Sequence, residues 1–311
     1  MLYYFLVLLS VIGLAINFSI NKIYQNRVGS GSRMVVLFNI VASSAMVVLF
    51  FFINGFMNGF ESFRLTPFSL MMAAIMALVC GGYSLVGFKI ISLGNIAVYT
   101  LFLMLGGMMI PYFFGLLFLD EHFSVWRLIG LILMVISIIL SGFEGDSTPK
   151  DQKSKRTTTL FFILCSVVFF LNGMSSITSK VHQLPEYADM AVTPQVFVLL
   201  TAAFRLLFFA IVYLCIRLHD RKQPKEQRTA SPIFSLPVIS LMLLSALVEG
   251  AAFMLQLIGA SHLPATVLYP LITGGVIILT ALAGLLLFKQ RLSRRATVGI
   301  ILCFASTFLF L

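Results

Sequence analysis

The sequence predicts an all-α integral membrane protein with ten transmembrane helices, arranged as two inverted repeats of five. Three observations predict this fold class: a shortage of charge, a series of apolar stretches of helix length, and a similarity between the two halves. Of the 311 residues, 60% are hydrophobic and only 10% are charged, whereas soluble domains carry about 25% charged residues. A water-soluble fold could not cover its surface with so few charges, so we expect most of the exterior to face lipid.

The apolar stretches have the length of transmembrane helices. Each covers roughly 18–25 residues, about twice what a barrel strand needs, and backbone inside lipid must satisfy its own hydrogen bonds. We expect spans near residues 2–21, 34–54, 68–88, 95–118, 125–143, 158–179, 193–216, 236–258, 264–287 and 296–311. The first stretch lacks a basic segment and a cleavage signal, so we interpret it as a span and not as a signal peptide.

A polar segment divides the chain into two units. Residues 144–157, EGDSTPKDQKSKRT, contain Pro, Gly, Ser and seven charges, a composition typical of a linker. We therefore expect a five-helix unit at 1–143, a hinge loop at 144–157 and a second five-helix unit at 158–311.

The two units are similar in sequence. The segment AVYTLFLMLGGMMIPYFFGLLFLDEHFSVWRLIGLILMVI parallels ATVLYPLITGGVIILTALAGLLLFKQRLSRRATVGIILCF, so that Gly106–Gly107 matches Gly274–Gly275. The first and sixth spans end alike, in KIYQ and KVHQ. Because each unit has an odd number of spans, the second must be inverted in the membrane. Inverted repeats are a common plan for secondary transporters, whose substrate site lies near the midplane between the halves.

The end of each unit carries a family resemblance. The segment GLLFLDEHFSVWRLIGLILMVISIILSG looks like the end of an EamA-type repeat, and LAGLLLFKQRLSRRATVGIILCF is its second copy. The chain thus resembles the EamA branch of the drug/metabolite transporter superfamily over nearly its full length, which implies transport of small molecules. Glu121 fills the acidic position of the first turn, but Gln290 occupies the matching place in the second. We therefore expect Glu121 to cap a helix or anchor a loop, and not to couple protons.

The basic residues indicate an orientation. The loops after odd-numbered spans contain 17 Lys and Arg residues, and the loops after even-numbered spans contain three. The positive-inside rule then places the odd loops in the cytoplasm and both termini outside. Members of the resembled family are usually drawn with both termini inside, so the two arguments disagree on direction but agree that the termini share one side. Since the net charge of +10 resides in these loops, it does not indicate a nucleic-acid partner.

Two charged residues lie deep in predicted spans, Arg205 in the seventh and Glu249 in the eighth. A charge at that depth costs at least ~2.5–3.5 kcal/mol, so each should face the protein interior or a wet cavity. One interpretation is a structural ion pair between adjacent spans. The other is functional: Glu249 receives a proton or a cationic group of the substrate, while Arg205 holds Glu249 or binds a substrate anion. Gln256 and Phe253 share the helix face of Glu249.

Weaker candidates are two polar stripes and three tyrosines. The stripes comprise Ser10, Asn17 and Asn21 in the first span and Asn172, Ser175, Ser176 and Ser179 in the sixth. Small polar residues often join transmembrane helices, and the alternative is that both stripes line a central cavity from opposite halves. Tyr83, Tyr99 and Tyr269 have an apolar ring and a hydroxyl suited to a cavity wall, although packing explains each of them as well.

Several other residues have structural interpretations. We expect Lys22 and Lys180, at span ends, to extend to the lipid headgroups. Pro111 and Pro270 lie in the matching fourth and ninth spans, where proline favours a kink, and paired weak points suit a gating carrier as well as a static bundle. We expect the four cysteines to be buried small residues in apolar spans; they are Cys80, Cys165, Cys215 and Cys303.

These features favour a secondary carrier or exporter of small metabolites or drugs. A lipid-linked transferase would need a cluster of catalytic or metal-binding groups, but the histidines are scattered without HExxH spacing. A channel or scaffold is a further alternative, although no filter-like Gly/Thr/Tyr loop is present. We expect no metal or cofactor. The expected partners are a small-molecule substrate and the lipid bilayer of the cell membrane, and no sequence pattern supports a homodimer.

Overall fold

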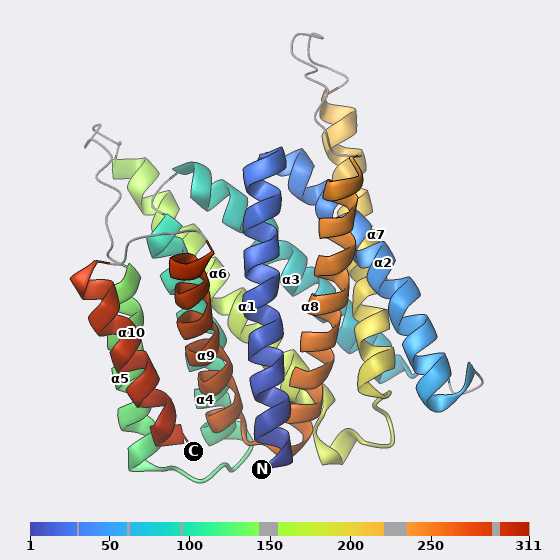
Figure 1. Cartoon of the computed structure of the whole chain (residues 1–311). Helices are drawn as coiled ribbons and strands as arrows, with labels where there is room; N and C mark the ends of the chain where they lie inside the picture. The colour runs from blue at the N-terminus through green and yellow to red at the C-terminus, as the bar shows by residue number, and fades with distance from the viewer. Residues whose placement is uncertain are drawn as a thin grey trace.

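The computed structural model describes residues 1–29, 31–60, 63–93, 96–142, 155–220, 235–287 and 293–310, and these residues form helices and connecting loops without a strand (Figure 1). The helices are α1 (Leu2–Val28), α2 (Ser32–Asn58), α3 (Pro67–Leu93), α4 (Ile96–Phe118), α5 (Val125–Gly142), α6 (Lys155–His182), η2 (Pro185–Tyr187), α7 (Pro194–Asp220), α8 (Leu236–His262), α9 (Ala265–Leu286), α10 (Arg294–Thr307) and η3 (Phe308–Phe310). Figure 1 shows both ends of the chain at the same end of the bundle.

The chain is a multi-pass membrane protein. In its described part, eight helices, α1 to α4 and α6 to α9, are long and apolar enough to cross a membrane. The other two are shorter: α5 has an apolar stretch at Val125–Leu140, and α10 has 14 residues. Large apolar side chains are exposed on the outside of the bundle, such as Phe51, Phe52 and Phe56 of α2, as expected for a surface in contact with lipid.

Most helices extend beyond the apolar stretches that predicted them. Helix α1 continues past residue 21 to Val28, because intrahelical hydrogen bonding continues through polar residues once a helix has formed. Helix α6 begins at Lys155, so the last three residues of the expected hinge belong to a helix. Residues 144–154 of that hinge lie outside the described residues.

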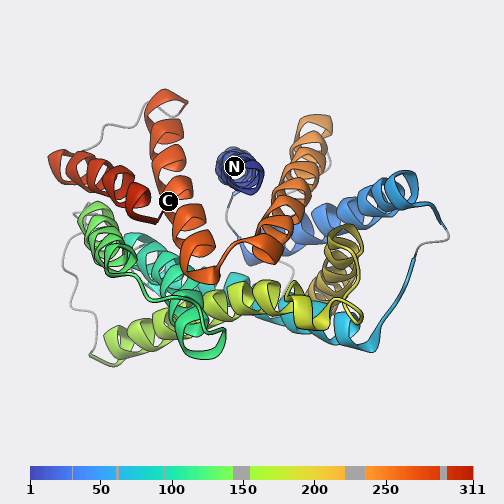
Figure 2. The same ribbon diagram turned by 90° about the horizontal axis from the view of Figure 1, so that it is seen from below.

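The helices pack in a pattern that is unchanged when each helix is exchanged for its counterpart in the other half. Helix α1 packs against α8 and α9, and α6 packs against the counterparts of those helices, α3 and α4. The α2–α7, α4–α9 and α5–α10 pairs each join a helix to its own counterpart. Figure 2 shows the bundle from below, with α5 and α10 together at one edge.

Two glycines allow a helix of one half to approach a helix of the other half closely. A Cβ on Gly81 of α3 would lie 2.3 Å from the ring of Phe208 in α7. A Cβ on Gly250 of α8 would lie 2.4 Å from the ring of Phe50 in α2. Gly81 and Gly250 match in the sequence similarity between the two halves, so a contact between a ring and a glycine occurs once in each half. Such close contact between helices is a common use of glycine within membranes.

Candidate functional site

A cavity of about 490 Å³ lies between the two halves, lined by residues of α1 to α4 and α6 to α9. Its volume falls in the range of about 300–1,000 Å³ that is typical of small-molecule sites. The structure brings nine of the candidate residues named from the sequence to this cavity: Asn17, Tyr83, Tyr99, Asn172, Ser176, Arg205, Glu249, Gln256 and Tyr269. Residues from distant parts of the chain therefore line one cavity.

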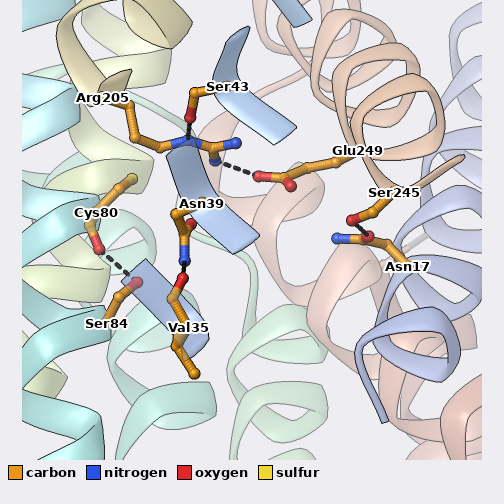
Figure 3. A network of polar contacts seen from close by, with 9 residues as sticks. All are labelled: Asn17, Val35, Asn39, Ser43, Cys80, Ser84, Arg205, Ser245 and Glu249. Carbon is orange, nitrogen blue, oxygen red and sulfur yellow. Dashed lines mark hydrogen bonds and ion pairs between the residues drawn. The ribbon is translucent and has the colours of Figure 1, made fainter. Parts of the chain in front are cut away.

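The most polar part of the cavity is the ion pair between Arg205 and Glu249. Arg205 Nη1 donates to Glu249 Oε1, and Arg205 Nε donates to Ser43 Oγ at 2.9 Å, so α7 is joined to both α8 and α2 (Figure 3). The two charged side chains are 13% and 27% exposed, respectively. The contact agrees with the structural interpretation of the two residues as an ion pair. The cavity leaves part of Glu249 accessible, and the functional interpretation remains a prediction.

Two polar atoms next to this pair have no partner. Arg205 Nη2 and Thr201 Oγ1 are buried and form no hydrogen bond with any described residue. Thr201 lies four residues before Arg205, and side chains at that spacing share a helix face. Both residues line the cavity. An unsatisfied buried donor is costly, at about 1–3 kcal/mol and more for a charged group, so this corner of the wall is suited to receive an acceptor atom.

The polar stripes both line the cavity and join helices. Asn17 Oδ1 accepts from Ser245 Oγ of α8 at 2.6 Å (Figure 3), and Asn172 Nδ2 donates to the Leu103 carbonyl of α4 at 2.7 Å. Ser10, by contrast, is outside the cavity and donates to a carbonyl of α8 at 2.8 Å. The two interpretations of these stripes are therefore not exclusive.

The three tyrosines line the cavity from three different helices. The hydroxyl of Tyr269 donates to the backbone carbonyl of Ser176, which joins α9 to α6 and fixes the ring in the wall. Tyr83 and Tyr99 are partly buried residues that line the cavity from α3 and α4.

The sequence did not identify several cavity residues. Thr201 and Cys80 are small residues within apolar helices, and no spacing pattern marks them as cavity residues. Ser43, which is not among the cavity-lining residues, was also missed as the partner of Arg205 Nε. The expectation that all four cysteines are buried was wrong: Cys80 lines the cavity and Cys215 is exposed near the end of α7. A hydropathy pattern places a cysteine in a span but does not give its direction around the helix axis.

The cavity extends toward one end of the bundle. Its lining residues in α1 lie between Leu14 and the exposed Gln25, and those in α4 lie between Tyr99 and Gly107. These are the parts of the two helices nearest the α1–α2 and α3–α4 connections, on the side opposite the chain termini (Figure 1).

Two charged side chains hold the α8–α9 turn at the opposite end. Lys180 Nζ donates to the carbonyls of Ala260 and Leu263 at 2.8 and 2.7 Å, at the C-terminus of α8. The Glu121 carboxylate accepts from the N–H groups of Ala265 and Thr266 at 2.6 and 2.8 Å, at the N-terminus of α9. Each charge has the sign that the adjacent helix terminus favours. Lys180 and Glu121, which we call the clasp, thereby hold the turn between α8 and α9.

These contacts decide two predictions. The capping role expected for Glu121 is confirmed. The expectation that Lys180 extends to the headgroups was wrong, because the residue is only 7% exposed and its ammonium group donates hydrogen bonds to helix carbonyls. Snorkelling requires that water be the nearest hydrogen-bonding partner, and here the open carbonyls of α8 are closer.

Comparison with known proteins is informative at two levels. Residues 184–311 match the model of the EamA-like transporter family. A solved structure, described only as the crystal structure of a protein, matches over 97% of this chain and 95% of that chain, with a TM-score of 0.68 and 14% sequence identity. At that identity the likeness shows the fold alone. No curated protein matches the chain.

Proposed function

We propose that this chain, whose residues 184–311 belong to the EamA-like transporter family, is a secondary active transporter of small organic molecules. One observation carries the proposal: the cavity between the two halves contains an intramembrane ion pair, Arg205–Glu249, surrounded by amide and hydroxyl side chains. A cavity of about 490 Å³ suits a metabolite or drug of modest size.

Alternating access between two inverted five-helix repeats is the mechanism that we propose. The exchangeable packing of the two halves supports an approximate two-fold relation between them, and carriers with this plan move one half against the other around a fixed midplane site. The cavity reaches toward one end while the Lys180–Glu121 clasp closes the other. With the basic loops in the cytoplasm, this arrangement is the inward-facing state.

Glu249 is the proposed coupling residue. It is partly exposed to the cavity and paired with a single cation, so protonation or a cationic group of the substrate would each change its contact with Arg205. Asn17, Asn172, Ser176 and Gln256 would offer hydrogen bonds to the substrate, and Tyr83, Tyr99 and Tyr269 would form its aromatic walls.

Counterflow in proteoliposomes tests the proposal. Vesicles loaded with an unlabelled solute should accumulate the same labelled solute transiently if the protein is a carrier, whereas a channel would only equilibrate it. A panel of organic acids, amines and neutral solutes should contain at least one that shows counterflow. If the reconstituted, correctly folded protein shows none across the panel, the transporter proposal fails.

Replacing Glu249 tests its role within that proposal. If Glu249 couples transport to protons, Glu249→Gln should strongly reduce transport driven by a pH gradient and retain part of the substrate exchange. If Glu249 binds a cationic substrate, both activities should weaken together. Wild-type transport with unchanged pH dependence in Glu249→Gln would exclude both roles.

A further inference from the structure

The charge balance and the unpartnered atoms around Arg205 point to the chemistry of the substrate. Among the described residues that line the cavity, the formal charges at neutral pH are one cation and one anion, Arg205 and Glu249. Arg205 uses Nη1 for Glu249 and Nε for Ser43, while Nη2 is buried without a partner. The hydroxyl of Thr201, one turn away on the same helix, is also without a partner.

We infer that Arg205 and Thr201 form a carboxylate-binding subsite, and that the substrate is a small organic monocarboxylate that takes the place of Glu249 on Arg205. This inference rests on the proposed transport function and specifies its substrate. A guanidinium group presents parallel N–H donors that match the two oxygens of a carboxylate. Thr201 adds one hydroxyl donor beside them. The apolar walls, including Phe18 and Phe253, would cover the organic part.

Charge balance favours a monocarboxylate over other ligands. An uncompensated charge within the membrane is costly, so a bound anion requires that Glu249 lose its charge. A phosphate dianion would leave one negative charge beyond what Arg205 offsets. An amine would leave Arg205 Nη2 and Thr201 Oγ1 without acceptors.

Proton uptake by Glu249 completes the exchange. One proton from solvent binds the Glu249 carboxylate, Arg205 stays a cation, and one carboxylate anion replaces Glu249 as its partner, so the loaded site is neutral. The other titratable groups lining the cavity are a thiol and four phenols, from Cys80, Tyr24, Tyr83, Tyr99 and Tyr269. Thiols and phenols are neutral near pH 7, and they do not supply this charge change. Each cycle would move one proton with one monocarboxylate, without net charge.

Matched probe molecules test the ligand class with a native reporter. Cys80 lines the same cavity, so in the full-length Cys215→Ser protein its alkylation by N-ethylmaleimide reports occupancy, with thermal stability as a second readout. The probes are two isosteric sets: benzoate, benzamide and benzylamine, and propionate, propionamide and propylamine. We expect a carboxylate to protect Cys80 and raise the melting temperature at millimolar concentration, and more strongly at pH 6 than at pH 8, where both acids remain ionised.

Two variants separate the subsite from the protein scaffold. Thr201→Val removes a hydroxyl that has no partner, so folding should be unimpaired, while carboxylate affinity should fall about three- to tenfold. Thr280→Val is the matched control, since Thr280 lies outside the cavity and bonds within α9, and affinity should not change. Glu249→Gln should bind the carboxylate at least as tightly as the parent at pH 8 and lose the pH dependence.

Three results would overturn the inference. One is protection of Cys80 by the amine or the amide but not by the acid. Another is that neither acid changes the alkylation of Cys80 or the melting temperature. The third is loss of carboxylate binding in Glu249→Gln. In proteoliposomes, uptake of the effective acid should follow a pH gradient and be insensitive to membrane potential. If counterflow is found for amines or neutral solutes instead, the transporter proposal survives and the monocarboxylate inference fails.

Discussion

Arg205 illustrates how one residue combines structural and functional demands. Its guanidinium joins α7 to α2 through Ser43 and to α8 through Glu249, two contacts that a small hydrophobic residue would not provide. It also retains one unpartnered donor beside the cavity. A residue used for packing alone would be expected to have all of its buried donors satisfied.

Neutralising Glu249 should destabilise the protein by a measurable amount. Breaking a fully buried pair costs roughly 3–5 kcal/mol, but Glu249 is 27% exposed, so we expect about 1–3 kcal/mol for Glu249→Gln after discounting for screening. Adding Arg205→Leu should recover most of this loss, because no buried charge is then left without a counter-charge. Thermal unfolding of both variants in detergent measures the effect. A double mutant less stable than the single mutant would contradict the explanation.

A second prediction at the residue scale concerns the clasp on the α8–α9 turn. Glu121→Gln should destabilise the protein by about 1–2 kcal/mol, because the carboxylate accepts hydrogen bonds from two backbone N–H groups at a helix N-terminus. Glu186→Gln is a suitable control, since Glu186 is an exposed acid in η2. The free energy of unfolding of this variant should stay within about 0.5 kcal/mol of the parent value. Equal effects of the two changes would show that the contact of Glu121 is not what stabilises the turn.

At the scale of helices, the bundle depends on small residues at matching positions. Helices α4 and α9 continue through Pro111 and Pro270. Helices α3 and α8 instead use Gly81 and Gly250 to accept an aromatic ring from the neighbouring helix. The repeated use of the same device in both halves indicates that the two helix pairs are held in the same way.

Filling the space at Gly81 should separate α3 from α7. Gly81→Ala places a Cβ 2.3 Å from the Phe208 ring, and overpacking of this kind typically costs 1–3 kcal/mol. Phe208→Leu should partly relieve the cost, because a smaller side chain leaves room for the methyl group. Gly31→Ala is the control, as nothing lies within 4 Å of its Cβ position. The prediction fails if the Gly81 and Gly31 variants have the same melting temperature.

At the scale of the whole molecule, the loop charges predict its orientation. The 17 basic residues of the odd-numbered loops should hold those loops in the cytoplasm, with the clasped α8–α9 turn outside. A reporter fused after Leu311 should therefore be extracytoplasmic, and one inserted within residues 147–154 cytoplasmic. The reverse pattern would favour the orientation usual in the resembled family and would make the described cavity outward-facing.

Features that depend on local composition could be predicted from the sequence. Apolar stretches of helix length predicted each α-helix that the described residues form, although the extents of α1 and α6 were underestimated, because a helix continues into polar residues without a change in backbone geometry. Arg205 and Glu249 were identified as candidates, with an ion pair as one of two interpretations, because a charge deep in a span is costly and must be paired or hydrated. The same argument does not identify Thr201, whose hydroxyl is ordinary in a membrane helix.

The sequence by itself determined the membrane class, the places of the helices in the described residues and the two charged residues at the centre, because these follow from the free energy of placing each segment in lipid. Only the tertiary structure decided which faces of the helices meet. It turned Thr201 and Cys80 toward the cavity and Lys180 onto the end of α8. These outcomes depend on the rotation of each helix about its axis and on contacts between residues far apart in the chain. Hydropathy is insensitive to both, because a helix rotated within the bundle keeps the same composition while its polar atoms meet different partners.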